Sequence, residues 1–418
     1  MGLSMSERRA VTKAMRTKYA KGSKSEKGEV LDALCQATGW HRDHARKALR
    51  AAIARGEEPP PPRRRRQPPR RYDDTIIKAL RVCWAVLDGP TGKRLAPALP
   101  QLVTSLRAHG ELDLTDAQAS LLCQMSPATI DRRLADDRAQ LVIGKGRSMT
   151  KPGSLPKSSI PMKTWSEWSN TTPGFVEIDL VSHDGGDNNG EYCWSLCVTD
   201  IATDWTRAAT VMGKGERRIT TALEQIWLTW PVHLAGIHSD NGSEFINHHL
   251  ARWCQTRQIT FSRSRPTRSN DNAWVEQKNW SLIRLCAGYY RYDTTRELSL
   301  LNQIWSAETE LVNLFLPQQK LATKTRDGAK ITKTYHPALT PYQRLQQGWP
   351  DLLDPHDQHD LDTRITTINP AALRRTVADL QANLTELARR RGPVTPRRNR
   401  HEVYSSKRKI SPPGTRAS

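Results

Sequence analysis

The sequence lacks any run of about eighteen apolar residues, the length at which a segment becomes a candidate membrane-spanning helix. Its first residues, MGLSMSERRAVTKAMR, contain no apolar core and so do not resemble a secretory signal. We therefore expect no membrane partner and a cytoplasmic location.

The cysteines lack the spacing of a structural zinc site. The seven of them are scattered singly, and no CxxC pair is matched by a second pair or by an HxxxH. This pattern excludes the common zinc modules, and the odd count is typical of a reducing compartment.

Acidic residues are too few to balance the basic ones. The chain has 64 Lys and Arg against 43 Asp and Glu, a net charge of +21. The excess lies at the two ends: residues 1–71 carry a net +12 and residues 389–418 a net +9, whereas residues 72–388 carry none. This distribution favours a polyanionic partner, nucleic acid first, although solvated tails that only aid solubility would show it too.

The N-terminal region, residues 1–56, contains a pattern of two helices around a break at Thr38-Gly39. The second helix turns an apolar face inward and a basic face outward, which is typical of a helix-turn-helix module that binds DNA. Helical hairpins unrelated to DNA share the pattern. The expected DNA contacts are His41, Arg42, His44, Arg46 and Lys47.

A linker and a second helical region follow. Residues 57–71, EEPPPPRRRRQPPRR, favour extended polyproline, and their arginines either lie along phosphates or form only a spacer. Residues 72–150 are predicted to be helical, with Ser126 and Pro127 starting the second helix of another helix-turn-helix. The basic residues expected to meet DNA are Arg63, Arg64, Arg65, Arg66, Arg132 and Arg133.

After a linker at residues 151–168, the pattern changes to strands alternating with helices. Apolar, β-branched runs such as GFVEIDLVSHDG and LAGIHSD predict strands, and ERRITTALEQIWLTW predicts an amphipathic helix. We expect an α/β core at residues 169–325, a mixed five-stranded sheet covered by helices. Residues 326–388 form a C-terminal region with a helix near 370–391, and residues 389–418 a basic disordered tail.

Three carboxylates stand at comparable places in this core. Asp179 and Asp240 end the apolar runs of the first and fourth strands, and Glu276 lies in the helix after the last strand. If strands one and four are neighbours, the three groups converge and repel one another, which implies a bound cation. Oxygen ligands suit Mg²⁺ or Mn²⁺, and two such ions can drive phosphodiester chemistry.

The spacing of these residues resembles that of the DDE transposase and retroviral-integrase superfamily, which has an RNase H-like fold. Thirty-five residues separate Asp240 from Glu276, and HSDNGSEF, SNDNAWVEQKNW and HPALTPYQRL are similar to segments of bacterial insertion-sequence transposases. The resemblance spans residues 172–345. It implies that Asp179, Asp240 and Glu276 are the catalytic residues and the ligands of two Mg²⁺ or Mn²⁺ ions.

The chain departs from the superfamily at a basic position. Many relatives place Lys or Arg seven residues after the glutamate to touch the DNA end, whereas this chain has Ile283. Lys278 and Arg284 are the candidates to replace it. His183 is either an auxiliary catalytic or DNA-positioning residue or a polar surface residue, and Asn241 is a second auxiliary candidate.

The resemblance implies a DNA transposase that cleaves strands at the ends of a mobile element and joins the 3′-hydroxyl to target DNA. Its partner would be double-stranded DNA, bound by a homodimer or a larger oligomer, in the cytoplasm and at the nucleoid of a bacterium. Two alternatives remain open. One is a DNA-binding regulator with an inactive core, and the other is a metal-dependent nuclease that does not join strands.

Overall fold

The computed structural model describes residues 3–54, 71–139, 172–242, 244–245, 247–265 and 272–391. The chain divides into two compact units, residues 1–71 and residues 72–418. The four arginines Arg63–Arg66, the linker at 151–168 and residues 392–418 of the predicted tail lie outside the described residues, whereas the first residues of that tail, 389 and 390, end the last helix.

The N-terminal unit is helical throughout residues 3–54, except at its turns. Its second and third helices are joined at Gly39, whose φ of +69° suits glycine and which donates its N–H to the carbonyl of Cys35. The predicted pair of helices is therefore present, and a further helix precedes it. The elements are α1 (Met5–Lys21), α2 (Lys24–Thr38) and α3 (Arg42–Ala54).

A small apolar core holds these helices together. The buried side chains come from all of them, and Leu34 and Leu49 at its centre are fully buried. Serines cap the first two helices, because Ser4 and Ser23 each form a capping box with a glutamate three residues later.

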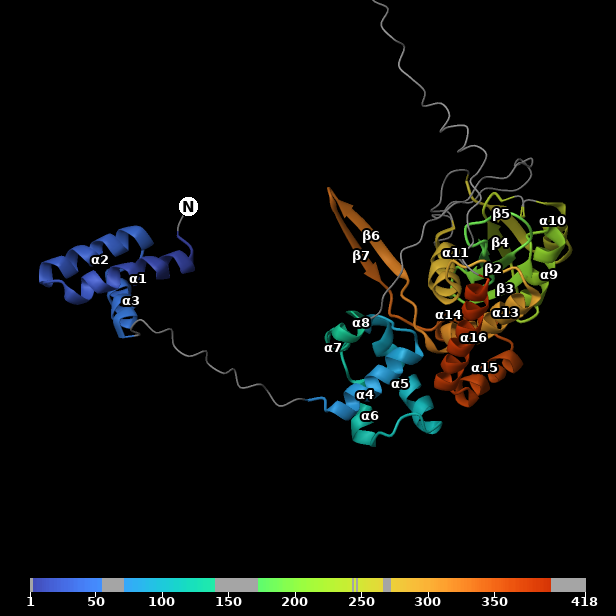
Figure 1. Ribbon diagram of the computed structural model, residues 1–418, viewed down its shortest axis with the longest axis horizontal. Helices are drawn as coiled ribbons and strands as arrows, with labels where there is room; N and C mark the ends of the chain where they lie inside the picture. Colours follow the sequence, from blue (N-terminus) through green and yellow to red (C-terminus); the bar gives the residue numbers. More distant parts are fainter. Residues whose placement is uncertain are drawn as a thin grey trace, which may run out of the picture. The chain divides into compact units, whose positions relative to one another are not determined.

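The second unit is built on a mixed sheet whose strands, within the described residues, lie in the order β3-β2-β1-β4-β5 (Figure 1). The pairs β1–β2 and β2–β3 are antiparallel, whereas β1–β4 and β4–β5 are parallel. The predicted mixed five-stranded sheet is confirmed, with the first and fourth strands adjacent. The strands are β1 (Phe175–Ser182), β2 (Cys193–Asp200), β3 (Thr206–Met212), β4 (Gly236–Ser239) and β5 (Thr260–Arg263).

Different helices cover the two faces of the sheet. Alternate residues of a strand point to opposite faces, so Ile178 packs with α9 and α10, whereas Val181 packs with the helices that follow β5. Trp305 is buried in the second layer and donates its indole N–H to Oγ1 of Thr210, 2.7 Å away. The covering elements are α9 (Glu216–Trp227), α10 (His248–Thr256), α11 (Ala273–Lys278), η3 (Asn279–Arg284), α12 (Leu285–Ala287), α13 (Thr295–Glu310) and η4 (Leu311–Phe315).

The outer edge of β3 is closed by side-chain amides. Asn302 and Asn313 each accept a hydrogen bond from a strand N–H and donate one to the C=O of the same residue, Thr210 and Thr206 respectively. Each amide thus replaces a neighbouring strand, which blocks further strands from adding at this edge.

The second helical region shares its apolar core with the sheet rather than forming a core of its own. Arg94 donates to the carbonyl of Pro317 at 2.8 Å, and Arg374 of the C-terminal helix donates to the carbonyl of Val86 at 2.8 Å. Ser126 and Pro127 begin a helix as expected. The elements are α4 (Asp74–Val86), α5 (Gly92–Ala108), α6 (Asp116–Cys123), α7 (Pro127–Arg133) and α8 (Ala135–Ala139).

The C-terminal region adds helices and an unpredicted pair of strands. The helix expected near 370–391 is present as α16, which packs against α13 in the second core layer. Within the described residues, no helix is both long and apolar enough to cross a bilayer. The elements are β6 (Leu321–Asp327), β7 (Lys330–Tyr335), α14 (Pro341–Gly348), η5 (Pro350–Leu352), α15 (Pro355–Thr367) and α16 (Pro370–Arg390).

Candidate active site

The register of β1 and β4 brings two of the predicted acids to one edge of the sheet. Ile178 is paired with Ser239 in the parallel ladder, and each is followed directly by an aspartate, Asp179 and Asp240. Parallel strands end at the same edge, so the two carboxylates leave adjacent strands side by side.

Glu276 lies on α11 near this edge of the sheet. Hydrogen bonds to a second glutamate, Glu177 of β1, hold α11 against the strand. Glu177 lies two residues before Asp179, on the same face of the strand, and its side chain is fully buried. Its Oε2 accepts hydrogen bonds from the backbone N–H groups of Trp274 and Val275, both at 2.9 Å. Since these N–H groups belong to the first turn of α11, Glu177 caps the helix that carries Glu276.

Glu177 was not among the residues predicted from the sequence. A charged residue within the apolar run VEIDL was the available signal, because such a group is rarely buried without a partner. Burial raises the pKa of Glu177 to about 8, against the lowering effect of the two N–H groups. The carboxyl group therefore stays largely protonated at neutral pH.

The three predicted carboxyl groups act on one another electrostatically. Burial first, and then the charges of Asp240 and Glu276, together raise the pKa of Asp179 to about 8. Burial and then Asp240 raise the pKa of Glu276, while burial is the main cause of the raised pKa of Asp240. Negative charges in such a group are stabilised when a cation joins them.

Two neighbouring contacts orient Asp179 and Asp240. Oδ2 of Asp179 accepts a hydrogen bond of 2.6 Å from Nδ2 of Asn279, one turn after Glu276. Oδ1 of Asp240 accepts one of 2.8 Å from the N–H of Gly242. A Cβ at Gly242 would lie 2.9 Å from Oδ1 of Asp240 and 2.8 Å from Oε1 of Glu244, so glycine lets both carboxylates approach this turn.

The chemistry of these side chains fits a hard divalent cation. All of the donors are oxygen atoms, as Mg²⁺ and Mn²⁺ prefer. Two buried oxygens beside Asp179, Oε1 of Glu177 and Oδ1 of Asn279, accept no hydrogen bond. Among the described residues, no three His, Cys, Asp or Glu side chains are gathered in ligating positions. Asp179 contacts the amide of Asn279.

A basic side chain lies at the border of this site. Nζ of Lys214, just before α9, is 3.6 Å from Oε2 of Glu244 and 5.1 Å from the ring centroid of Trp194. Lys214 lowers the pKa of Asp240, opposing the effects of burial and of Glu244. Glu244 lies beside Asp240, whose pKa its charge raises.

A π-helix follows α11 and alters which residue shares a side with Glu276. Its i to i+5 hydrogen bonds take up one more residue per turn than an α-helix does. The eighth residue after Glu276 therefore occupies the angular position that the seventh would have in an α-helix. The seventh, Ile283, is fully buried, and the eighth, Arg284, is partly exposed with its guanidinium 4.7 Å from the ring centroid of Tyr289.

Lys278 was the other candidate for a DNA contact, but its side chain is buried. Its side chain is only 5% exposed, beneath α11, where burial lowers its pKa to about 8. Two residues along a helix differ by more than half a turn, so Lys278 points into the protein while Glu276 is exposed.

His183 is a fully buried core residue, which corrects the expected alternative of a polar surface residue. Nε2 of His183 is 2.8 Å from Oγ of Ser195, and its ring packs 5.5 Å from that of Tyr292, centroid to centroid. Burial lowers its pKa from 6.5 to about 3, with a further contribution from Arg284. Asn241 bridges β4 and β5, since it donates to the carbonyl of Ser264 at 2.8 Å and accepts from Arg263 at 2.9 Å.

The burial of His183 predicts a specific acid sensitivity. Between pH 6.5 and about 3 the unfolded chain binds a proton at this ring and the folded chain does not, so stability falls as pH falls. Relative to His183→Gln, which retains a group that can bond Ser195, the wild type should lose about 1.4 kcal/mol of unfolding free energy per pH unit. Urea denaturation of both proteins at pH 7 and pH 5 measures this. Identical pH dependence would contradict a buried neutral histidine.

The basic residues predicted in the helical regions lie on surfaces. His41, just before α3, is exposed, as are Arg42, His44 and Lys47 on α3, and Arg46 is half-buried. Arg42 pairs with Asp32, and Arg46 lies 2.8 Å from Asp43. On α7, Arg132 and Arg133 are both exposed.

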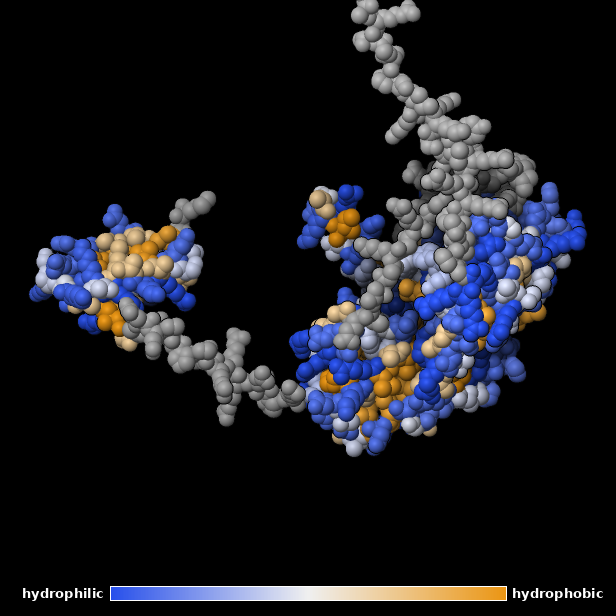
Figure 2. All heavy atoms as spheres, viewed as in Figure 1, coloured by the Kyte–Doolittle hydropathy of each residue, from blue (hydrophilic) through white to orange (hydrophobic). Residues whose placement is uncertain are grey.

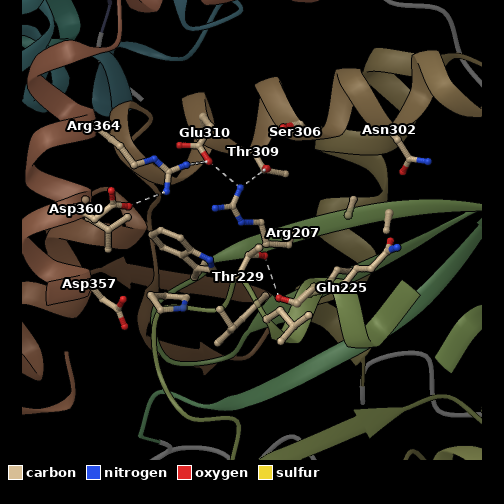
Figure 3. Close-up of a pocket in the computed structure, with 18 residues that line it drawn as sticks. Arg207, Gln225, Thr229, Asn302, Ser306, Thr309, Glu310, Asp357, Asp360 and Arg364 are labelled. Atoms are coloured by element: carbon tan, nitrogen blue, oxygen red, sulfur yellow. Dashed lines mark hydrogen bonds and ion pairs between the residues drawn. The ribbon is translucent and has the colours of Figure 1, made fainter. Parts of the chain in front are cut away.

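A hollow of about 660 Å³ lies elsewhere, at the outer edge of β3, between α9, α13 and α15 (Figure 3). Its charged side chains pair with one another: Arg207 is 2.7 Å from Glu310, and Arg364 contacts both Glu310 and Asp360. None of the three candidate carboxylates lines it.

A family model identifies an integrase core domain in this chain. The family model "Integrase core domain" matches residues 170–269, which include Asp179 and Asp240 and end before Glu276. "Uncharacterized protein y4rM" of Sinorhizobium fredii (strain NBRC 101917 / NGR234) is 35% identical over 344 residues, 82% of this chain and 96% of that protein. The catalytic core domain of BIV integrase is a similar solved structure, with 16% identity, a TM-score of 0.29, and coverage of 43% of this chain and 97% of that one.

Proposed function

Because the chain belongs to the DDE transposase and retroviral-integrase superfamily, we propose that it is a DNA transposase. It would cleave a strand at each end of a mobile element and join the freed 3′-hydroxyl to target DNA. The observation that carries this proposal is the adjacency of Asp179 and Asp240 at the ends of neighbouring parallel strands, with Glu276 on the helix attached to the same strand.

Integrase-family core domains generally use divalent metal ions, and the oxygen donors of this site suit Mg²⁺ or Mn²⁺. Asp179, Asp240 and Glu276 would hold two ions per site, which would supply an activated water or hydroxyl and stabilise the leaving oxygen of the phosphodiester. Asn279 orients Asp179, the N–H of Gly242 orients Asp240, and Glu177 holds the helix of Glu276 in place. The nucleophile comes from water and then from DNA, so no covalent enzyme intermediate is needed.

The helical regions are proposed to recognise DNA. The exposed basic side chains of α3 and of α7 each follow a turn between two helices, the arrangement in which a second helix enters the major groove. Two element ends must be processed together, so the active species is proposed to be a homodimer or larger on DNA, which light scattering of the DNA complex would measure. Such a protein would act at the bacterial nucleoid, in the cytoplasm.

Arg284 is proposed to touch the DNA end, because the π-helix places it on the side of Glu276. Arg284→Ala should lower the slope of log affinity against log salt concentration by about 1, as the loss of one phosphate contact does. Arg284→Lys keeps the charge and should keep the slope. Fluorescence anisotropy with a labelled duplex measures both. An unchanged slope for Arg284→Ala would remove this residue from the interface.

Strand transfer in vitro tests the proposed function. Oligonucleotides copied from the DNA that flanks the gene are mixed with a plasmid and Mg²⁺ or Mn²⁺, with wild type and with Glu276→Gln. Products joined by the wild type alone support a transposase. Nicked but unjoined DNA would favour a nuclease, and binding without cutting would favour a regulator.

A further inference from the structure

The strands β6 and β7 form an isolated antiparallel ribbon. Within the described residues they pair only with each other in the sheet, and every residue except the half-buried Leu321 is exposed. Figure 1 shows the ribbon projecting from the body of the second unit, and in Figure 2 it carries hydrophilic residues beside apolar ones. A ribbon with almost every side chain exposed contributes little to the core and is only marginally stable by itself. Its exposed faces are therefore candidate binding surfaces.

The base of the ribbon is anchored, which fixes the direction in which it projects. Gln318 and Leu339, on the two chain segments that lead into and out of it, form a bridge with a hydrogen bond of 2.8 Å. Arg344 donates to the carbonyl of Gln318 at 2.8 Å, and Lys320 donates to the carbonyl of Ala202 at the same distance. The arm therefore starts from groups tied to the core.

The register gives the ribbon two different faces. Lys324 is opposite Lys333, and Arg326 is opposite Ile331. Side chains alternate along each strand, so these four residues share a face with Tyr335, and we call it the basic face. The other face carries Asp327 opposite Lys330 and two threonine pairs, of which Thr323 and Thr334 are hydrogen-bonded at 2.6 Å.

The basic face is electrostatically unfavourable for the free protein. Like charges directly opposite in an antiparallel ladder destabilise it, and Lys324 faces Lys333 without an acid on that side of the ribbon. The face also exposes two large apolar side chains, Ile331 at 48% and Tyr335 at 46%. A polyanion laid along the face would neutralise the paired lysines.

We propose that the basic face of this ribbon is a DNA-binding arm that lies against double-stranded DNA through contacts to phosphates. The dimensions suit this partner, because the major groove admits a two-stranded β-ribbon. Its cations are suited to phosphates rather than to a particular sequence. The proposal rests on the proposed function, since it assigns a further contact to the same DNA substrate.

The test measures binding by the full chain to a fluorescein-labelled 40-base-pair duplex of arbitrary sequence, in EDTA, so that binding does not depend on catalysis. Each lost phosphate contact lowers the salt slope by about 0.9, and contributions add, so the basic tails do not hide the effect. Lys324→Gln/Arg326→Gln/Lys333→Gln should lower the slope by about 2 to 3 and weaken binding at least tenfold. The matched control, Lys330→Gln, removes one charge from the opposite face and should leave binding within twofold.

A second readout locates the contact. Trypsin cuts after lysine and arginine, so exposed ribbon sites should be cleaved in the free protein and protected when the duplex is added. An unchanged salt slope in the triple variant, or cleavage unaffected by DNA, would overturn the proposal. Because the substituted side chains are exposed, the variant should melt at the wild-type temperature, and a large fall would direct the comparison to Lys333→Gln alone against Lys330→Gln.

These outcomes distinguish failure of the proposed DNA-binding arm from failure of the proposed transposase activity. If the wild type binds DNA through the ribbon but joins no strands, the proposed transposase activity is contradicted and the proposed DNA-binding arm is not. A triple variant that binds like the wild type contradicts the arm even if strand transfer occurs. A ribbon that is protected by a second protein but not by DNA would also contradict it.

Discussion

Asp240→Asn is expected to lower strand cleavage at least about a thousandfold, a rise of about 4 kcal/mol in the barrier, while DNA binding stays within about twofold. Asparagine keeps the oxygen that accepts the N–H of Gly242, so the turn should survive. Asparagine lacks the negative charge that a divalent cation needs. The loss of that charge also relieves the repulsion with Asp179 and Glu276. Cleavage of a labelled end duplex and anisotropy of the same duplex measure the two effects.

Asp357→Asn is the matched control for this change. It makes the same substitution in an exposed residue of α15, away from the three carboxylates, and should cleave like the wild type. If Asp240→Asn retained cleavage, the assignment of Asp240 to the active site would be wrong. Loss of both cleavage and binding, with a lowered melting temperature, would mean that the substitution acts through folding.

Glu177→Leu is expected to lower cleavage about a hundredfold, although Glu177 is proposed to touch neither DNA nor metal. The substitution leaves the N–H groups of Trp274 and Val275 without their acceptor at the start of α11. Unpaired buried groups cost about 1–3 kcal/mol each. The helix should shift to find other partners and carry Glu276 with it, and a displacement of about 1 Å at an active site can cost about a hundredfold in rate.

Glu177→Gln distinguishes positioning from chemistry. The wild-type carboxyl group has a pKa of about 8 and is largely protonated at neutral pH, so an amide resembles it closely. Its carbonyl oxygen can accept the same two N–H groups, and cleavage should recover to within about tenfold of wild type. If the glutamine variant is as inactive as the leucine variant, the carboxylate itself takes part in the reaction.

Much of the core could be predicted because its local patterns are clear. The apolar run at 175–182 and the helical period at 216–227 appear where strand and helix were expected. Ser126 and Pro127 begin α7 because capping and a fixed φ act within one turn. The ribbon at 321–335 was missed for the converse reason. All its residues except the half-buried Leu321 are exposed, so no alternation of apolar and polar residues marks its strands.

In the candidate site, too, some residues could be predicted from the sequence and others acquire their roles only in the folded protein. Asp179, Asp240 and Glu276 were identified by spacing and by resemblance, whereas Glu177 and Asn279 acquire their roles from α11 lying against β1. Lys278 shows where prediction from the sequence fails. It is a basic residue close to Glu276 in the sequence, and it was therefore a candidate for the DNA contact. The fold turns it inward, and the π-helix brings Arg284 to that side instead.

By itself, the sequence determined where the strands, helices and caps begin, which residues carry charge, and which acids end apolar runs. These properties depend on neighbours a few residues away. Only the tertiary structure decided that β1 lies beside β4, that Glu177 holds α11, that His183 is buried, and that two lysines face each other across a ribbon. Each of these depends on groups far apart in the chain, whose meeting is set by strand order, register and packing rather than by local preference.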